Sequence, residues 1–149
     1  MDLLAILKQK SRPVYTITSD HCVDDAIKLM TAKNAGALIV TADGDPTGIF
    51  TEKDVFRCYQ QNRNSALSKI KLNRVITREF IVAKPTENLT AVINRMIKSD
   101  IYHLPVMENQ KIMGVLALKD LVEFQIESLT EEIHQLKEYI EDLHEAGQD

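Results

Sequence analysis

Two short segments place an aspartate six residues after a glycine, in a pattern that suits ligand binding. The first reads GIFTEKD over residues 48–54 and the second reads GVLALKD over residues 114–120. Each aspartate, Asp54 or Asp120, falls in the first turn of an expected helix, where the helix dipole favours the ionised carboxylate. Two carboxylate oxygens can accept hydrogen bonds from the adjacent 2′- and 3′-hydroxyls of a ribose. We therefore predict that both aspartates bind a sugar.

Thr51 lies three residues before Asp54, at the expected corner between a strand and a helix. Its hydroxyl and the free N–H groups of the helix N-terminus can bind a phosphate oxygen. The simpler interpretation is that Thr51 caps the helix, and both roles can hold together. Helix stabilisation alone is likewise the simpler role of the two aspartates. Ala117 takes the equivalent place in the second segment, so we expect the second site to lack the hydroxyl.

The two segments belong to an internal repeat. After a shift of 66 residues, residues 14–57 align with residues 80–123 without a gap. Several positions keep their apolar character, and seven are identical: Ile27/Ile93, Met30/Met96, Leu38/Leu104, Val40/Val106, Gly48/Gly114, Lys53/Lys119 and Asp54/Asp120. The chain therefore contains two copies of one structural unit.

Each copy has the pattern of a β-α-β-β-α unit. Strands are expected at 14–17 and 80–83, helices at 23–33 and from 89, strands at 38–40 and 104–107, and turns at 42–46 and 108–110. Ser19 or Asp20 can cap the first helix. Gly48 and Gly114 fall inside the third strand, where glycine often marks a bulge or a close backbone approach. Neither copy is expected to bury its apolar faces alone, so the copies should pack about a pseudo-twofold axis.

This pattern resembles the CBS domain, named for cystathionine β-synthase. The family motif runs Gly, apolar, any residue, Ser or Thr, two residues, Asp. GIFTEKD matches it throughout, GVLALKD lacks the hydroxyl, and IYHLPV at 101–106 is also typical of the family. The resemblance implies an α/β fold with two repeats forming a CBS pair, or Bateman module. Its expected parts are a helix at 1–11, motif 1 at 12–62, a linker at 63–79, motif 2 at 80–124 and a coiled-coil helix at 125–146.

The resemblance also implies a ligand, an adenine nucleotide such as AMP or ATP, and no metal. The adenine would lie in apolar slots lined by Ile49, Phe80 and Ile81 in the first site, and by Val115, Val14 and Tyr15 in the second. Lys53, Lys119 and His103 are the candidates for contacting the phosphates. Ordinary core packing is the simpler interpretation of the apolar residues, and a structural role is the simpler one for His103. The choice among AMP, ADP, ATP, S-adenosylmethionine and a dinucleotide stays open.

A heptad pattern follows the second copy. The apolar residues that form it are Ile126, Leu129, Ile133, Leu136, Ile140 and Leu143. Ile at position a with Leu at position d favours a parallel two-stranded coiled coil, and Glu132 can meet Lys137 of a partner helix. We therefore predict a homodimer; the alternative is a helix folded back on the body. Ser128 with Glu131 could form a capping box that interrupts the helix.

Composition and motifs exclude several function classes. The chain has 149 residues, a net charge of −4 and 44% hydrophobic residues, with no apolar run long enough for a membrane helix. The start, MDLLAILKQK, has no features of a signal peptide, so we expect a cytoplasmic protein. No hydrolase, zinc or P-loop motif is present, so no enzyme is expected. The sequence thus indicates a regulatory nucleotide sensor that signals to an unidentified protein, with a ligand-independent dimeric scaffold as the alternative.

The linker carries an excess of basic residues, namely Arg63, Lys69, Lys71, Arg74 and Arg78 against Glu79. A solvated surface is the simpler interpretation of such a run. A patch that faces phosphate or a partner is the other. The excess is too small to argue for nucleic-acid binding, which we do not expect.

Overall fold

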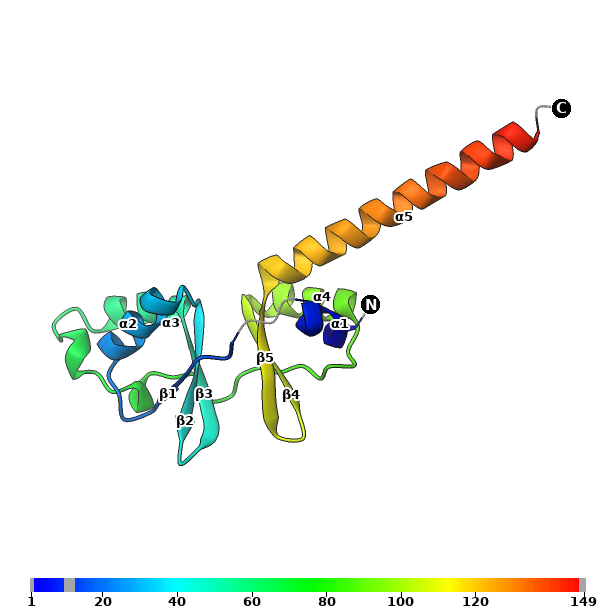
Figure 1. Cartoon of the computed structure of the whole chain (residues 1–149). Helices are drawn as coiled ribbons and strands as arrows, with labels where there is room; N and C mark the ends of the chain where they lie inside the picture. Colours follow the sequence, from blue (N-terminus) through cyan, green and yellow to red (C-terminus); the bar gives the residue numbers. More distant parts are fainter. Residues whose placement is uncertain (1, 10–12, 148–149) are drawn as a thin grey trace.

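The computed structural model describes residues 2–9 and 13–147. Its elements are α1 (Leu3–Gln9), β1 (Thr16–Thr18), α2 (Val23–Lys33), β2 (Ala37–Ala42), β3 (Asp45–Thr51), α3 (Glu52–Gln61), the 3₁₀ turns η1 (Leu67–Lys69) and η2 (Leu72–Arg74), α4 (Leu89–Ser99), β4 (His103–Glu108), β5 (Lys111–Ala117) and α5 (Leu118–Ala146). The expected order of two similar units joined by a linker is confirmed, and Figure 1 shows the units side by side.

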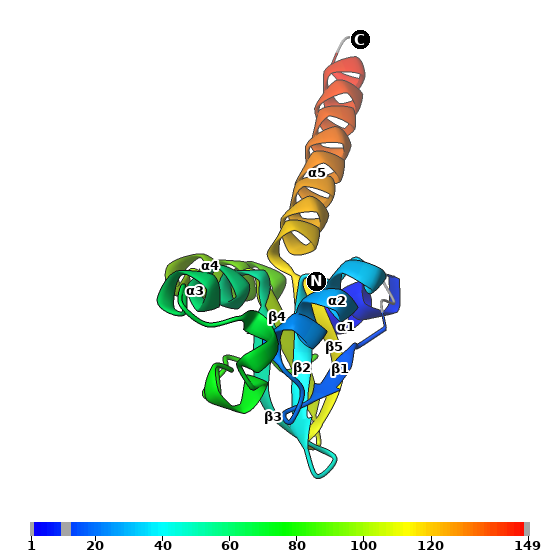
Figure 2. The same cartoon turned by 90° about the vertical axis from the view of Figure 1, so that its left-hand side faces the viewer.

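Each repeat places a β-hairpin between two helices. In the first repeat β1 runs parallel to β2, and β2 pairs antiparallel with β3; in the second, β4 pairs antiparallel with β5. Both hairpins turn through two residues in the left-handed backbone region, Asp43-Gly44 and Asn109-Gln110. Such turns match the twist of the flanking strands. Figure 2 shows α3 and α4 on one side of the hairpins and α1 and α2 on the other.

The glycines at equivalent places in β3 and β5 mark both a bulge and a close approach, as predicted. The strand register shifts between Pro46 and Gly48 and between Ile112 and Gly114, so one residue directly before each glycine is left unpaired. A Cβ atom at Gly48 would lie 2.8 Å from Cδ1 of Ile76, and one at Gly114 would lie 2.7 Å from Cδ2 of Leu7. A side chain at Gly48 would also meet the Thr77 carbonyl at 2.9 Å and push the linker away, whereas one at Gly114 would require the Leu7 side chain to move.

The expected strand at 80–83 is wrong. Ala83 alone of these residues pairs with the hairpin, in an isolated parallel bridge with Val106. In the first repeat the Ile39 N–H donates to the Tyr15 carbonyl at 3.0 Å and extends the parallel ladder. Pro105 takes the place of Ile39 in the second repeat and has no N–H to donate to Ile81, so the ladder ends at Ala83.

Two predicted helix signals are also wrong. Helix α2 is capped by Cys22, not by Ser19 or Asp20, and the Cys22 N–H donates to the Asp25 carboxylate at 3.3 Å. An acidic residue at this position of the first turn can satisfy the cap N–H, which the sequence-based interpretation overlooked. Helix α5 runs unbroken through Ser128, because neither Gly nor Pro interrupts its apolar pattern.

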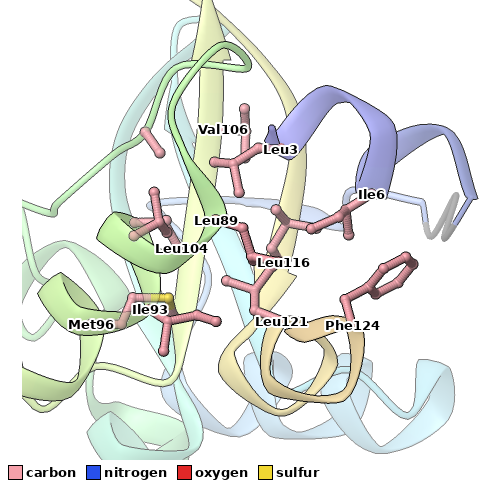
Figure 3. Close-up of a cluster of buried hydrophobic side chains, with 12 residues drawn as sticks. Leu3, Ile6, Leu89, Ile93, Met96, Leu104, Val106, Leu116, Leu121 and Phe124 are labelled. Atoms are coloured by element: carbon pink, nitrogen blue, oxygen red, sulfur yellow. The ribbon is translucent and has the colours of Figure 1, made fainter. Parts of the chain in front are cut away.

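The N-terminal helix completes the core of the second repeat. Leu3 and Ile6 of α1 are fully buried and join a cluster with Leu89, Leu116 and Phe124. Figure 3 shows these side chains meeting between α1, α4, β5 and the start of α5. The helix is held in place by backbone bonds, the Leu4 N–H donating to the Pro85 carbonyl at 3.0 Å. Residues 1, 10 and 11 of the predicted helix lie outside the described residues.

A separate cluster fills the first repeat, formed by apolar residues of β1, α2, β2, β3, α3 and the linker. The linker contributes Ile70 and Leu72 to this cluster. The 3₁₀ turns therefore pack on the first core, while their basic side chains, Lys69 and Arg74, are exposed.

Helix α5 has a buried start and an exposed remainder. Leu121 and Phe124 are buried, whereas the heptad residues from Ile126 to Leu143 are 47–58% exposed. The helix extends away from the body, as Figure 1 shows. The predicted alternative, a helix folded back on the body, is therefore wrong. Among the described residues, no helix is long and apolar enough to cross a membrane.

Removal of the Leu3 side chain tests whether α1 belongs to the core. Leu3→Ala should lower the free energy of unfolding by about 2–4 kcal/mol, because it leaves a cavity where the neighbours cannot fully close. Chemical denaturation at fixed protein concentration measures this change. Lys8→Ala, an exposed substitution on the same helix, is the control. Equal stability of the two variants would contradict a core role for α1.

Candidate functional site

A cleft of about 470 Å³ opens at the corner where β3 becomes α3. Its size suits a small organic ligand. One wall comes from the first repeat, and the others come from the end of the linker and from the segment between α4 and β4. The lining residues are Ile49, Thr51, Glu52, Lys53, Asp54, Phe56, Arg57, Thr77, Glu79, Phe80, Ile81, Ser99, Asp100, Ile101, Tyr102 and His103. We call this the first cleft.

Asp54 holds the corner of the first cleft. Its Oδ2 atom accepts the backbone N–H of Thr51 at 2.8 Å and the Thr51 hydroxyl at 3.2 Å. Thr51 is the N-cap of α3, as the simpler interpretation of this residue predicted, and Asp54 completes the capping box. Asp54 is only 5% exposed, yet it lines the cleft rather than the sealed core. The carboxylate therefore stands at the cleft floor in a fixed orientation.

Both cations of the first cleft are paired with carboxylates. The Arg57 guanidinium donates to Asp54 Oδ1 at 2.6 Å. The Lys53 ammonium donates to the Asp100 carboxylate at 2.7 Å and lies 5.7 Å from the centre of the Tyr102 ring. This bond raises the pKa of Lys53 and lowers the pKa of Asp100, so both stay charged at neutral pH. The Lys53–Asp100 pair also joins the two repeats across the cleft mouth.

The apolar side of the first cleft is built on strand β3. Ile49 exchanges two backbone bonds with Thr77, at 3.0 and 3.2 Å, so the linker extends the edge of the hairpin. Phe80 and Ile81 follow directly and line the cleft beside Ile49. The three apolar residues predicted to flank a base are thus brought together around one opening.

A second cleft of about 320 Å³ lies at the equivalent corner of the second repeat. It is lined by Pro13, Val14, Tyr15, Lys33, Asn34, Ala35, Gly36, Ala37, His103, Val115, Ala117 and Asp120. Val14, Tyr15, Val115 and Asp120 are therefore placed as the repeat implies. Lys119, a candidate for contacting the phosphates, is not among the described residues that line this cleft. Its side chain is exposed on α5.

Each cleft is lined by residues of both repeats. The wall of the first cleft at 99–103 and that of the second at 33–37 differ by the 66-residue shift. In each case the segment before a strand is bonded to the helix N-terminus of its own repeat, while it lines the cleft of the other repeat. Glu52 N–H donates to the Gly36 carbonyl at 3.2 Å, and Leu118 N–H donates to the Tyr102 carbonyl at 2.8 Å. Neither repeat forms a complete cleft by itself.

His103 lies between the clefts and lines both. A Cβ atom at Gly36 would lie 2.6 Å from its Cε1 atom, so glycine is needed where the imidazole packs. Burial lowers the pKa of His103, while the charges of Glu52 and Asp120 act in the opposite direction. The neutral imidazole is therefore favoured in the folded protein.

Comparison with known proteins decides the family. The family model described as "CBS domain" matches residues 7–61 and 72–127. The chain belongs to the CBS-domain family. The two matches cover the two repeats, so the protein carries a CBS pair, and the predicted family and fold are confirmed.

Curated and solved CBS proteins show the same similarity. A mitochondrial CBS domain-containing protein of Arabidopsis thaliana, CBSX3, is 30% identical over 128 residues, covering 83% of this chain and 62% of that protein. A CBS-domain protein structure from Burkholderia ambifaria MC40-6 is 31% identical with a TM-score of 0.79, covering 85% and 94% of the two chains. The CBS domain pair of protein MJ0100 is 23% identical with a TM-score of 0.74, covering 86% and 98%, and shares the fold.

Several residues of the CBS clefts were missed by the motif. Asp100 and Tyr102 line the first cleft, and Asn34 and Gly36 are their equivalents in the second. The 66-residue shift relates the two sets, but it gave no reason to place them at a cleft. Arg57 was not among the predicted site residues, because its bond to Asp54 depends on the helical geometry of α3.

The lowered pKa of His103 predicts a pH-dependent stability. Above pH 6.5, the ordinary pKa of histidine, the imidazole is neutral in both states and adds no pH dependence. Below it the unfolded chain binds a proton that the folded chain resists, so stability is lost as the pH falls. Wild type should therefore lose more stability than His103→Asn between pH 7 and pH 5, measured by urea denaturation. His134→Asn, an exposed change on α5, should behave as wild type; identical pH profiles for His103→Asn and wild type would contradict the assignment.

Proposed function

We propose that the protein is a regulatory module that binds an adenine nucleotide between its CBS repeats and signals through the conformation of a homodimer. The first cleft carries the proposal. It combines a fixed carboxylate, Asp54, with the hydroxyl of Thr51 and the apolar residues Ile49, Phe80 and Ile81. A carboxylate suits a ribose, a helix N-terminus suits a phosphate, and an apolar slot suits a base.

The chemistry of a structural relative supports the ligand class. The CBS domain pair of protein MJ0100 was solved in complex with 5′-methylthioadenosine and S-adenosyl-L-methionine. Both ligands contain an adenosine, so they share the base and the ribose that the first cleft suits. AMP and ATP add a phosphate, which the N-terminus of α3 favours. A ligand panel for this protein therefore comprises AMP, ATP, S-adenosylmethionine and 5′-methylthioadenosine.

Helix α5 supports a homodimer. Its heptad residues leave a continuous apolar stripe exposed along the part of the helix that extends from the body. A second copy of the same helix, placed parallel, would cover this stripe and bring Glu132 near Lys137 of the partner. Because α5 also supplies Asp120 to the second cleft, the dimer axis and a ligand site share one helix.

A ligand-independent scaffold is the second candidate, and the exposed stripe of α5 favours it equally. In that case the dimer would recruit a protein partner whether or not a nucleotide is bound. Nucleotide-dependent shifts in melting temperature distinguish the two functions. A stabilisation by any member of the panel supports the sensor, and the absence of any shift supports the scaffold.

Asp54→Ala should weaken nucleotide binding more than Asp120→Ala does. The first cleft carries the full motif, whereas Ala117 replaces the phosphate-binding hydroxyl of the second. Loss of a hydrogen bond to a charged group costs about 1.5–3 kcal/mol, so we expect a loss in affinity of about tenfold or more for Asp54→Ala. Calorimetric titration with AMP measures it, with Asp45→Ala on the exposed start of β3 as the control. Equal losses for the two aspartates would contradict the asymmetry.

The combined change Ile133→Glu and Leu136→Glu should convert the dimer into a monomer. It places charges at consecutive a and d positions, which a coiled coil would have to bury. Light scattering after size exclusion measures the mass. Glu131→Lys, on the outer side of the same helix, should leave the dimer intact. A dimer mass for the double variant would show that other surfaces pair the chains.

A further inference from the structure

The carboxylate that is proposed to bind a ribose is already engaged on both oxygens. Thr51 donates to Oδ2 of Asp54 from its backbone N–H and its hydroxyl, and Arg57 donates to Oδ1 at 2.6 Å. A carboxylate offers about four acceptor positions, two on each oxygen, and a vicinal diol needs two of them. Thr51 fills both positions on Oδ2 and Arg57 takes one on Oδ1, so a single position is left. Both hydroxyls can bind Asp54 only after Arg57 has left Oδ1.

The two partners of Asp54 differ in how readily they leave. The Thr51 contacts belong to the cap of α3 and hold the carboxylate in place. The Arg57 side chain is 47% exposed and lines the same cleft, so it can turn toward solvent or a ligand, whereas the Asp54 side chain is only 6% exposed and stays in place. Arg57 can therefore leave without disturbing the position of Asp54.

The second cleft carries no arginine at the equivalent position. The position equivalent to Arg57 is Glu123, and the position equivalent to Thr51 is Ala117. An ionised glutamate has no N–H or O–H to donate to Asp120, so it cannot compete with a diol in the same way. Any effect of Arg57 on binding belongs to the first cleft alone.

We propose that Arg57 is a specificity-determining latch of the first cleft. Its guanidinium is closed on Asp54 at 2.6 Å. The 2′- and 3′-hydroxyls of a nucleotide displace it, and the freed guanidinium then pairs with an anionic group of the same ligand. This inference rests on the proposed nucleotide binding and adds a selection rule. A nucleotide displaces Arg57 from Asp54 and offers its phosphate as a new ion-pair partner. An uncharged nucleoside displaces Arg57 in the same way but offers no anion in exchange.

Arg57 also contacts the linker. The same Arg57 nitrogen donates to the carbonyl of Val75 at 3.3 Å, two residues before Thr77 bonds to Ile49. When Arg57 turns to a ligand, this contact between α3 and the linker is lost. Ligand binding in the first cleft thereby changes a contact of the linker at the edge of strand β3.

Calorimetric titration with adenosine and with AMP tests the latch. The measurements use the full chain carrying Asp120→Asn, which disables the second cleft with little change in volume. Arg57→Gln should bind adenosine about twofold to fivefold more tightly, because no ion pair has to be opened. It should bind AMP no more tightly, so the preference for AMP over adenosine falls. Arg57→Lys, which keeps a positive charge, should restore part of that preference.

The matched control is Arg95→Gln. Arg95 bonds to Glu87 at 2.8 Å on the second repeat, has a similar exposure and is not among the described residues of either cleft. It should leave both affinities unchanged. If Arg57→Gln binds adenosine no more tightly than the Asp120→Asn chain, the latch is wrong while nucleotide binding stands. If that parent chain and the wild type bind neither ligand, the proposed function and the latch both fail.

A measurement without any change at Arg57 is independent of effects on folding. Added salt screens the half-exposed Arg57–Asp54 pair and also screens the attraction to a phosphate. Adenosine affinity should therefore rise with NaCl concentration, while AMP affinity should fall. Two affinities that move in the same direction would overturn the latch.

Discussion

The Thr51 N–H donates to the Asp54 carboxylate at 2.8 Å, at the point where β3 becomes α3, and the geometry of the first cleft depends on this bond. It satisfies a backbone group that would otherwise be left open at the helix N-terminus. It also holds a charged side chain that is almost fully buried at the floor of a cleft. The same carboxylate thus stabilises the helix and faces the ligand space, so neither role can change without the other.

The clefts exist because the repeats complete each other. Each one takes its carboxylate from one repeat and its opposite walls from the segments that lead into the other. The backbone bonds from Glu52 to Gly36 and from Leu118 to Tyr102 fix these walls at the helix N-termini. His103 lines both clefts, so a change in its position alters both openings at once. A ligand held between the repeats would therefore change how the two repeats pack against each other.

Helix α5 extends this arrangement beyond the body. Its first turns carry Asp120 and pack with α1 in the second core, and its later turns present the apolar stripe. A continuous helix is a stiff connection between the two regions. The second cleft and the proposed dimer contact are thus physically linked, whereas the first cleft is linked through Arg57 and Val75 to the linker.

The sequence by itself determined the repeat, the order of the helices and hairpins, and the motif residues that line each cleft. These features depend on local patterns, such as apolar periodicity and the spacing of Gly, Thr and Asp, and a gapless repeat transfers them from one copy to the other. The heptad positions on α5 were equally readable, because they depend on helical spacing alone.

The tertiary structure decided which residues contact one another. The bridge at Ala83, the packing of α1 on the second repeat and the Lys53–Asp100 contact join residues that are distant in the chain. Their distances follow from packing, which a local pattern does not contain. The pairing of Arg57 with Asp54 needed only one helical turn, but its meaning for the cleft depended on the burial of the carboxylate. Sequence therefore specified the chemical groups, and the fold determined which of them compete for one another.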